Sequence, residues 1–397
     1  MVIRGYKVKE YVYYALLSLY LFYYSYRYIF KYNSSQTSPT YSDTPLAFQL
    51  LKYAILGCLL LVLVLQFRVT TRIPYRNRKI FLITALLIVQ FIVLGGLSKN
   101  LDAISTALIL VPILFYVRCG DLPSLSKVEK ILMVFWWFSF TYELLQIALY
   151  VVFKRLPALA YPTGKITDVR FGGAWDDPNG YALFTLFYLF YFLVKYRGIK
   201  QFCYVGATLL MLILTWSGTG FIAFVATAVI MLLIRLNDRQ LVNKYILVCG
   251  IALSLGLALF ALRFDDIVRV LGHYLQSKVG SVDDHLLGWD MSWANPLTLC
   301  GLYCNYSGGE VGYLRILSIG GFPALVAYLY VSLQGCVRAH AYMINQSSQY
   351  SALLFGVLAY VVAFLLFMVN LPPLVNFSCM GVFTCFLILA FTNKETA

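Results

Sequence analysis

Charged residues are scarce in this chain. Only 12% of its 397 residues are Asp, Glu, Lys or Arg, whereas 61% are hydrophobic, and the mean hydropathy is +0.77. A soluble domain of this size needs a far more polar surface than this composition supplies. The composition therefore excludes a soluble globular domain as the main body of the protein.

Histidine is also scarce, with three residues in the whole chain. His273 and His285 are the two that share a polar segment, and their spacing fits no standard zinc site. Among the nine cysteines, Cys300 and Cys304 form a C-x3-C pair, for which both a disulfide and free thiols stay open. Five others lie in apolar runs and are expected to be packing residues: Cys58, Cys203, Cys249, Cys379 and Cys385. We predict no metal and no cofactor.

We expect no cleavable signal peptide, and no internal repeat is evident at the level of residues. The first apolar run is long and aromatic and has no small-residue cleavage site, so we expect it to remain as a signal anchor. No appended soluble domain is expected, and residues 1–397 are predicted to form one integral-membrane domain. Gly and Pro interrupt the apolar runs at few points, which disfavours the broken helices of an ion-coupled transporter.

The chain consists largely of apolar runs, each long enough to cross a hydrocarbon core of roughly 30 Å. These runs are continuous rather than alternating, so they predict helices rather than a barrel. The sequence therefore predicts an all-α polytopic membrane protein with about 12 transmembrane helices. The expected spans are residues 11–30, 46–67, 80–97, 103–118, 131–153, 180–194, 201–216, 219–235, 245–262, 311–333, 351–369 and 374–392.

Basic residues recur in alternate connectors, as the positive-inside rule requires. With both termini in the cytoplasm, all of these connectors are cytoplasmic; they contain Arg68, Arg72, Arg76, Arg78, Lys79, Arg118, Lys127, Lys130, Lys195, Arg197, Lys200, Arg235, Arg239, Lys244 and Arg338. The formal net charge of +14 thus follows membrane topology, and we expect no nucleic-acid partner.

Two long polar loops, residues 154–179 and 263–310, fall on the outer side in this topology. They hold most of the outward-facing charged residues. Ionisable groups are costly in a membrane protein and are kept where they bind or react with something. We therefore expect these loops to form the functional face.

The first loop carries Arg170 before a Gly172-Gly173 pair and an Asp177-Pro-Asn-Gly turn. Glycine lets a ligand approach the backbone, and an arginine beside a helix N-terminus suits a phosphate. An ion pair between Arg170 and Asp176 or Asp177 explains the same residues equally well. The next motif, Thr215-Trp216-Ser217-Gly218-Thr219-Gly220, predicts a tight outer hairpin made by ordinary turn chemistry.

Most charges in the second loop fit a solvated face, including surface helices. Glu310 and Arg315 differ because they stand at the start of a predicted span, where burial is expected. Arg315 either snorkels to the interface or faces a polar cavity. Glu143, within the fifth predicted span, is a second intramembrane ionisable residue, and a structural pair between Glu143 and Arg315 stays open.

Together these motifs resemble the O-antigen polymerase and ligase superfamily of bacterial envelope glycosyltransferases. The resemblance rests on Arg170-Phe-Gly-Gly, Asp177-Pro-Asn-Gly, Trp216-Ser-Gly-Thr-Gly, Ala294-Asn-Pro-Leu and Gly320-Gly321, in this order. It covers residues 165–335, and the rest of the chain agrees only in hydropathy. Members of this superfamily often have an arginine just after the serine of the hairpin, whereas Gly218 follows Ser217 here. Arg263, Arg269 or Lys278 is expected to supply the anion contact that such an arginine would make. Ligase members usually carry a histidine at the start of the helix after the large loop, where this chain has Gly308-Gly309-Glu310. The resemblance therefore favours a polymerase over a ligase.

The resemblance implies a GT-C-like glycosyltransferase bundle with a large periplasmic loop in the bacterial inner membrane. Its substrate would be an oligosaccharide repeat unit on undecaprenyl pyrophosphate, which it would polymerise at the periplasmic face. Membrane lipid is an expected partner, and a chain-length regulator is a further one. Arg170, Arg263, Arg269, Lys278 and Arg315 would bind pyrophosphate. Glu310 is the first candidate for a general base, followed by His285 and Asp284.

Two other functions stay open on the sequence alone. A ligase would transfer the finished polysaccharide to lipid A-core. A flippase for lipid-linked oligosaccharides would usually have short loops on both faces and repeated halves. The long loop at residues 263–310 and the lack of an evident repeat disfavour this alternative.

Overall fold

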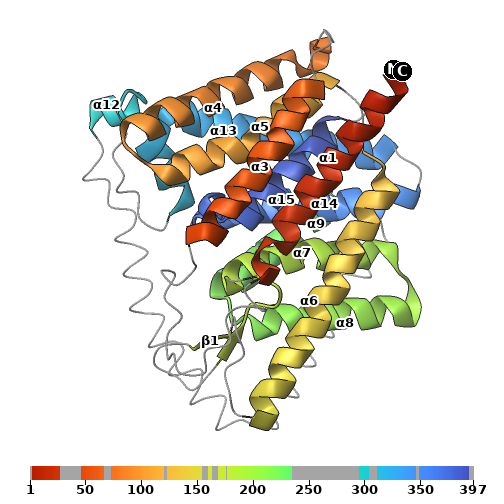
Figure 1. Ribbon diagram of the computed structural model, residues 1–397. Coiled ribbons are helices and arrows are strands. Elements are labelled where there is room, and N and C mark those ends of the chain that lie inside the picture. Colours follow the sequence, from red (N-terminus) through yellow and green to blue (C-terminus); the bar gives the residue numbers. More distant parts are fainter. Residues whose placement is uncertain are drawn as a thin grey trace.

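The computed structural model describes residues 2–26, 46–66, 73–119, 123–153, 160–162, 169–175, 177–234, 295–303, 311–345 and 348–392. These residues are almost entirely helical (Figure 1). The helices are α1 (Val2–Phe22), α3 (Leu46–Gln66), α4 (Arg78–Leu97), α5 (Leu101–Cys119), α6 (Leu125–Phe153), α7 (Pro178–Lys195), α8 (Gly198–Leu214), α9 (Gly218–Ile234), α12 (Pro296–Leu299), α13 (Gly312–Asn345), α14 (Ser348–Phe367) and α15 (Phe377–Phe391). Short 3-10 turns occupy η1 (Tyr23–Tyr26), η3 (Tyr75–Asn77) and η4 (Pro373–Val375), and β1 (Ala160–Pro162) pairs antiparallel with β2 (Val169–Phe171).

The described helices make this an all-α membrane protein. Five stretches are long and apolar enough to cross a membrane: Tyr75–Leu97, Leu101–Arg118, Leu125–Val152, Gly312–Ile344 and Tyr350–Phe367. Four shorter apolar helices accompany them: Leu50–Gln66, Gly198–Leu214, Gly218–Ile234 and Phe377–Phe391. Helices thus occur at every expected span except 245–262, which lies outside the described residues. The number that cross the membrane stays a prediction.

Large apolar side chains line the outer surface of the bundle. Leu82, Leu86 and Val89 of α4 are all more than half exposed, and Ile222 of α9 is 73% exposed. A soluble monomer rarely presents contiguous apolar surface of this kind, whereas a lipid-facing helix requires it. The exposure therefore agrees with the membrane assignment from composition.

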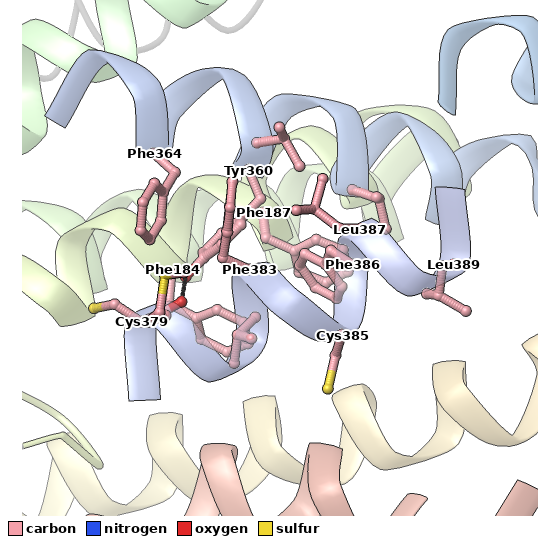
Figure 2. Packing of buried hydrophobic residues seen from close by; sticks show 14 of the residues in the cluster. Phe184, Phe187, Tyr360, Phe364, Cys379, Phe383, Cys385, Phe386, Leu387 and Leu389 are labelled. Carbon is pink, nitrogen blue, oxygen red and sulfur yellow. Dashed lines mark hydrogen bonds between the residues drawn. The ribbon is translucent and has the colours of Figure 1, made fainter. Parts of the chain in front are cut away.

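The centre of the bundle is aromatic and lies where α7, α14 and α15 meet (Figure 2). Phe364 stacks on Phe383 with ring centroids 4.2 Å apart, and Tyr360 meets Phe386 edge to face at 5.1 Å. The Tyr360 hydroxyl donates to the Cys379 carbonyl at 2.9 Å, so this buried polar group is satisfied. Nearly every residue of α7 is buried, which explains why its sequence is apolar on all faces.

The bundle has two opposite ends, which we call the basic end and the loop end. α1 and α15 run antiparallel, because Tyr13 bonds the Cys385 carbonyl whereas Tyr20 meets Phe377. The basic end, where α1 begins and α15 finishes, holds Glu129 with Lys195 and a bond from Arg338 to Asn77. The loop end is opposite and contains the β2–α7 segment, the α4–α5 and α8–α9 turns, α12 and the start of α13.

Among the described residues, this sorting of helix ends agrees with the predicted alternation of basic and neutral connectors, whereas Arg68, Arg72, Arg235, Arg239 and Lys244 lie outside them. In Figure 1, α12 and the β-hairpin lie toward the left, whereas α1 begins at the upper right. The side of the membrane that each end faces stays a prediction.

Gly381 sets how closely α1 approaches α15. A Cβ atom at this position would lie 2.1 Å from the ring of Tyr20. We expect Gly381→Ala to force the helices apart and to cost about 1–3 kcal/mol of stability. Thermal unfolding in detergent, followed by size-exclusion fluorescence, measures this. Gly206→Ala in α8 is the matched control, since its Cβ meets nothing within 4 Å; equal melting temperatures would contradict the prediction.

Candidate functional site

The structure describes two of the eight predicted site residues, Arg170 and Arg315. Both lie at the loop end. The other six lie outside the described residues: Arg263, Arg269, Lys278, Asp284, His285 and Glu310. Their assigned roles stay predictions, and the described part of the loop end is built around Arg170.

Arg170 lies in β2, opposite Tyr161 of β1. Its neighbour Phe171 is buried against Ile147 and Tyr150 of α6, with Tyr150 and Phe171 rings 6.3 Å apart. The strand is therefore packed onto one face of α6. This packing carries the Arg170 side chain to the first turn of α7.

The guanidinium of Arg170 joins three of the motifs that the sequence singles out. Its Nε donates to the Thr215 carbonyl at 2.9 Å, and its Nη2 donates to Asn179 Oδ1 at 2.8 Å. The Ser217 hydroxyl donates to the same Asn179 oxygen at 2.8 Å. Segments far apart in the chain thus meet in one hydrogen-bond network.

Asp177 explains why α7 begins beside Arg170. Its carboxylate accepts from the backbone N–H groups of Asn179 at 2.9 Å and Gly180 at 3.0 Å, and Pro178 takes the first helical position. Burial raises the pKa of Asp177, while the two backbone N–H bonds and the charge of Arg170 act in the opposite direction. Asp177 is thus a helix cap near Arg170, and the predicted alternative partner Asp176 lies outside the described residues.

The predicted hairpin at residues 215–220 is present as the α8–α9 turn. The Ser217 hydroxyl accepts from the Gly220 N–H at 3.0 Å and so caps α9, while Trp216 adopts a positive φ of 48°. Turn chemistry therefore accounts for the motif, as expected. The sequence did not reveal that the Thr215 carbonyl also accepts a hydrogen bond from Arg170.

The Ala294-Asn-Pro-Leu motif and the Gly320-Gly321 pair belong to one contact. Asn295 caps the short helix α12 by accepting from the Thr298 N–H at 2.8 Å. Gly321 interrupts α13 with a φ of 65°, and a Cβ there would lie 2.4 Å from the Leu299 carbonyl oxygen. Only glycine allows α12 to approach α13 so closely.

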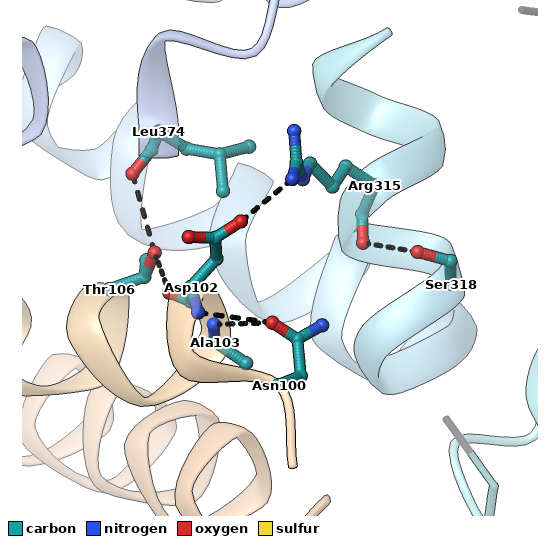
Figure 3. A network of polar contacts seen from close by, with 7 residues as sticks. All are labelled: Asn100, Asp102, Ala103, Thr106, Arg315, Ser318 and Leu374. Atoms are coloured by element: carbon teal, nitrogen blue, oxygen red, sulfur yellow. Dashed lines mark hydrogen bonds and ion pairs between the residues drawn. The ribbon is translucent and has the colours of Figure 1, made fainter. Parts of the chain in front are cut away.

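Arg315 pairs with Asp102, a residue that sequence reasoning missed (Figure 3). Its Nη2 lies 2.7 Å from Asp102 Oδ2, and their side chains are 14% and 42% exposed respectively. Asn100 accepts from the N–H groups of Asp102 and Ala103, which starts α5 in the right place for this contact. Glu143 instead accepts from the hydroxyl of Tyr181, so the pairing of Glu143 with Arg315 is not observed.

Within the described ranges, no three His, Cys, Asp or Glu residues lie together as a group that could hold a metal ion. This leaves the predicted absence of a metal untested, because His273 and His285 lie outside those ranges. Cys300 is a free, exposed cysteine. Its predicted alternative partner, Cys304, lies outside the described residues.

No protein-family model matches the chain, and no curated protein matches it either. Functional assignment therefore depends on the residues of the loop end and on the resemblance of their motifs.

Proposed function

We propose that the protein polymerises oligosaccharide repeat units carried on undecaprenyl pyrophosphate at the outer face of the inner membrane. The observation that carries this proposal is the network joining Arg170, Asn179, Thr215 and Ser217. Arg170, Asn179 and Ser217 belong to three of the motifs on which the resemblance rests, and Thr215 immediately precedes the third of these motifs. All four residues lie at one end of the bundle. The α12 contact with Gly321 unites two further motifs at that end.

The proposed reaction is a glycosyl transfer. A hydroxyl of the incoming unit attacks the anomeric carbon of the growing chain and forms a glycosidic bond. The bond from that carbon to the pyrophosphate oxygen breaks, and undecaprenyl pyrophosphate leaves with the bonding electrons. The proton of the hydroxyl passes to a base. Each new linkage therefore releases one lipid pyrophosphate.

Arg170 suits the stabilisation of that leaving group. Negative charge develops on the pyrophosphate as the bond breaks, and a cation already fixed in place lowers the barrier without reorganising. Two uncharged acceptors, the Thr215 carbonyl and Asn179, hold the guanidinium. These two bonds fix the plane of the guanidinium at the N-terminus of α7, where the backbone N–H groups of a helix also favour an anion.

The other proposed roles belong to the second loop. Arg263, Arg269 and Lys278 would add contacts to the pyrophosphate, and Glu310 would take the proton, with His285 and Asp284 as alternatives. Arg315, which pairs with Asp102 at the same end of the bundle, would add a further contact to the pyrophosphate.

A deletion strain of the source bacterium tests the function. We expect its lipopolysaccharide gel to show core carrying a single repeat unit, with the long ladder restored by the wild-type gene. A band of core without any repeat unit would instead indicate a ligase. An unchanged ladder would contradict the proposal for that polysaccharide.

A further inference from the structure

Glu143 is a buried carboxyl group in α6, and the residues that carry the proposed function do not include it. The residue is only 1% exposed to solvent. Oε2 accepts from the Tyr181 hydroxyl at 3.1 Å, while Oε1 has no hydrogen-bond partner among the described residues. An acidic group in this setting is costly for a membrane protein, which points to a functional reason for keeping it.

The hydroxyl end of Tyr181 touches the segment that follows Arg170. A Cβ at Gly173 would lie 2.4 Å from the Tyr181 hydroxyl oxygen and 2.1 Å from the ring carbon that bears it. Gly173 also has a φ of 53°, which glycine adopts without strain. The bond from Tyr181 to Glu143 thus fixes the surface on which this glycine rests.

The same face of α6 supports the segment at a second point. Glu143, Ile147 and Tyr150 follow helical spacing, and Phe171 packs against the latter two. At its far side the segment is anchored by Trp175, whose Nε1 donates to the Leu21 carbonyl at 3.1 Å. The Arg170–Trp175 segment therefore lies between α6, Tyr181 and the end of α1.

A second tyrosine–glutamate bond joins α6 and α7 at the basic end and provides a comparison. The Tyr191 hydroxyl donates to Glu129, and Lys195 lies 2.7 Å from the same carboxylate oxygen. That glutamate has a cation as a partner and lies far from the functional segment. Glu143 makes the equivalent bond at the loop end, directly behind Gly173.

We propose that Glu143 is a positioning residue that fixes the Arg170–Trp175 segment through the hydroxyl of Tyr181. In this role Oε2 of Glu143 acts as a hydrogen-bond acceptor. It holds the Tyr181 hydroxyl against Gly173, and the segment then presents Arg170 to Thr215 and Asn179. The inference rests on the proposed function only for its effect on polysaccharide length.

Hydrogen–deuterium exchange of the full-length protein in detergent micelles tests the structural part directly. The amide of Trp175 bonds the Gly172 carbonyl at 2.9 Å, so exchange of peptides covering residues 171–175 reports whether the segment is fixed. We expect Glu143→Ala and Tyr181→Phe to accelerate this exchange about tenfold, because the bond that orders Tyr181 is lost. Glu143→Gln keeps an acceptor oxygen and is expected to exchange like the wild type.

Glu129→Ala is the matched control, since it breaks the equivalent bond at the basic end. It is expected to leave peptides 171–175 unchanged. Peptides from α14 and α15 report global unfolding, and Tyr181→Phe, which removes one oxygen atom, decides the question if Glu143→Ala does not fold. Unchanged exchange in Tyr181→Phe would overturn the proposal.

The same variants in the deletion strain separate this inference from the proposed function. We expect Glu143→Gln to restore long chains and Glu143→Ala to shorten them. A Gln variant with a protected segment but no long chains would overturn the positioning role, since it would indicate that the acidic group of Glu143 does more than accept the bond from Tyr181. Altered exchange in a protein whose deletion leaves the polysaccharide intact would uphold the positioning role and refute the polymerase.

Discussion

Replacing Arg170 with alanine is expected to reduce polymerisation by about 10²–10³-fold while the protein remains inserted in the membrane. The variant removes a cation that two uncharged acceptors hold at the loop end. Arg170→Lys keeps the charge but cannot reproduce both bonds of the planar guanidinium, so we expect an intermediate loss of about tenfold. Chain length on a lipopolysaccharide gel of the complemented deletion strain, normalised to membrane protein level, measures both variants.

Arg197→Ala is the matched control for Arg170. Arg197 is an exposed arginine before α8 at the basic end. Its removal changes the net charge by the same amount without touching the loop end, so long chains should persist. Equal chain lengths in Arg170→Ala and wild type would remove Arg170 from the site.

Replacing Gly173 with alanine is the second change for which we expect a large effect. The new Cβ would collide with the ring and hydroxyl of Tyr181 at 2.1–2.4 Å, and the residue would have to keep a φ of 53°. Left-handed backbone costs a non-glycine residue about 1–2 kcal/mol, and overpacking adds about 1–3 kcal/mol. The segment is expected to shift and carry Arg170 away from Thr215 and Asn179, with loss of long chains.

Gly198→Ala separates backbone strain from collision. Gly198 has a similar φ of 61°, but a Cβ there meets nothing within 4 Å, and it lies at the basic end. We expect this variant to lose some thermal stability and to retain long chains. Loss of long chains in both variants to the same degree would show that proximity of Gly173 to Tyr181 does not matter.

The sequence predicted the helical frame well because hydropathy is a local property of the chain. Every described long helix overlaps an expected span, although α1 begins nine residues earlier and α13 continues to Asn345, and the turn at residues 215–220 follows from local Ser and Gly chemistry. For the described basic connectors, clustering at one end also followed, since alternation of antiparallel helices fixes it. These features depend only on residues that are near one another in sequence.

Contacts between distant segments were not predictable in the same way. Asp102 joins Arg315 across 213 positions, and nothing in its own surroundings identifies that partner. Tyr181 lies within an aromatic run whose members all appear equivalent by composition, yet it is the one that bonds Glu143. Likewise, Gly320-Gly321 and Asn295-Pro296 were recognisable separately, whereas their contact depends on the bend of α13.

Reconstitution of the purified protein tests the central claim most directly. Lipid-linked repeat units extracted from the deletion strain would be added to liposomes that contain the wild-type protein or Arg170→Ala. We predict that the wild-type protein forms chains of several repeat units and releases one undecaprenyl pyrophosphate per linkage, and that Arg170→Ala forms few. Absence of both new linkages and released lipid pyrophosphate with an inserted, folded wild-type protein would contradict the assignment as a polymerase.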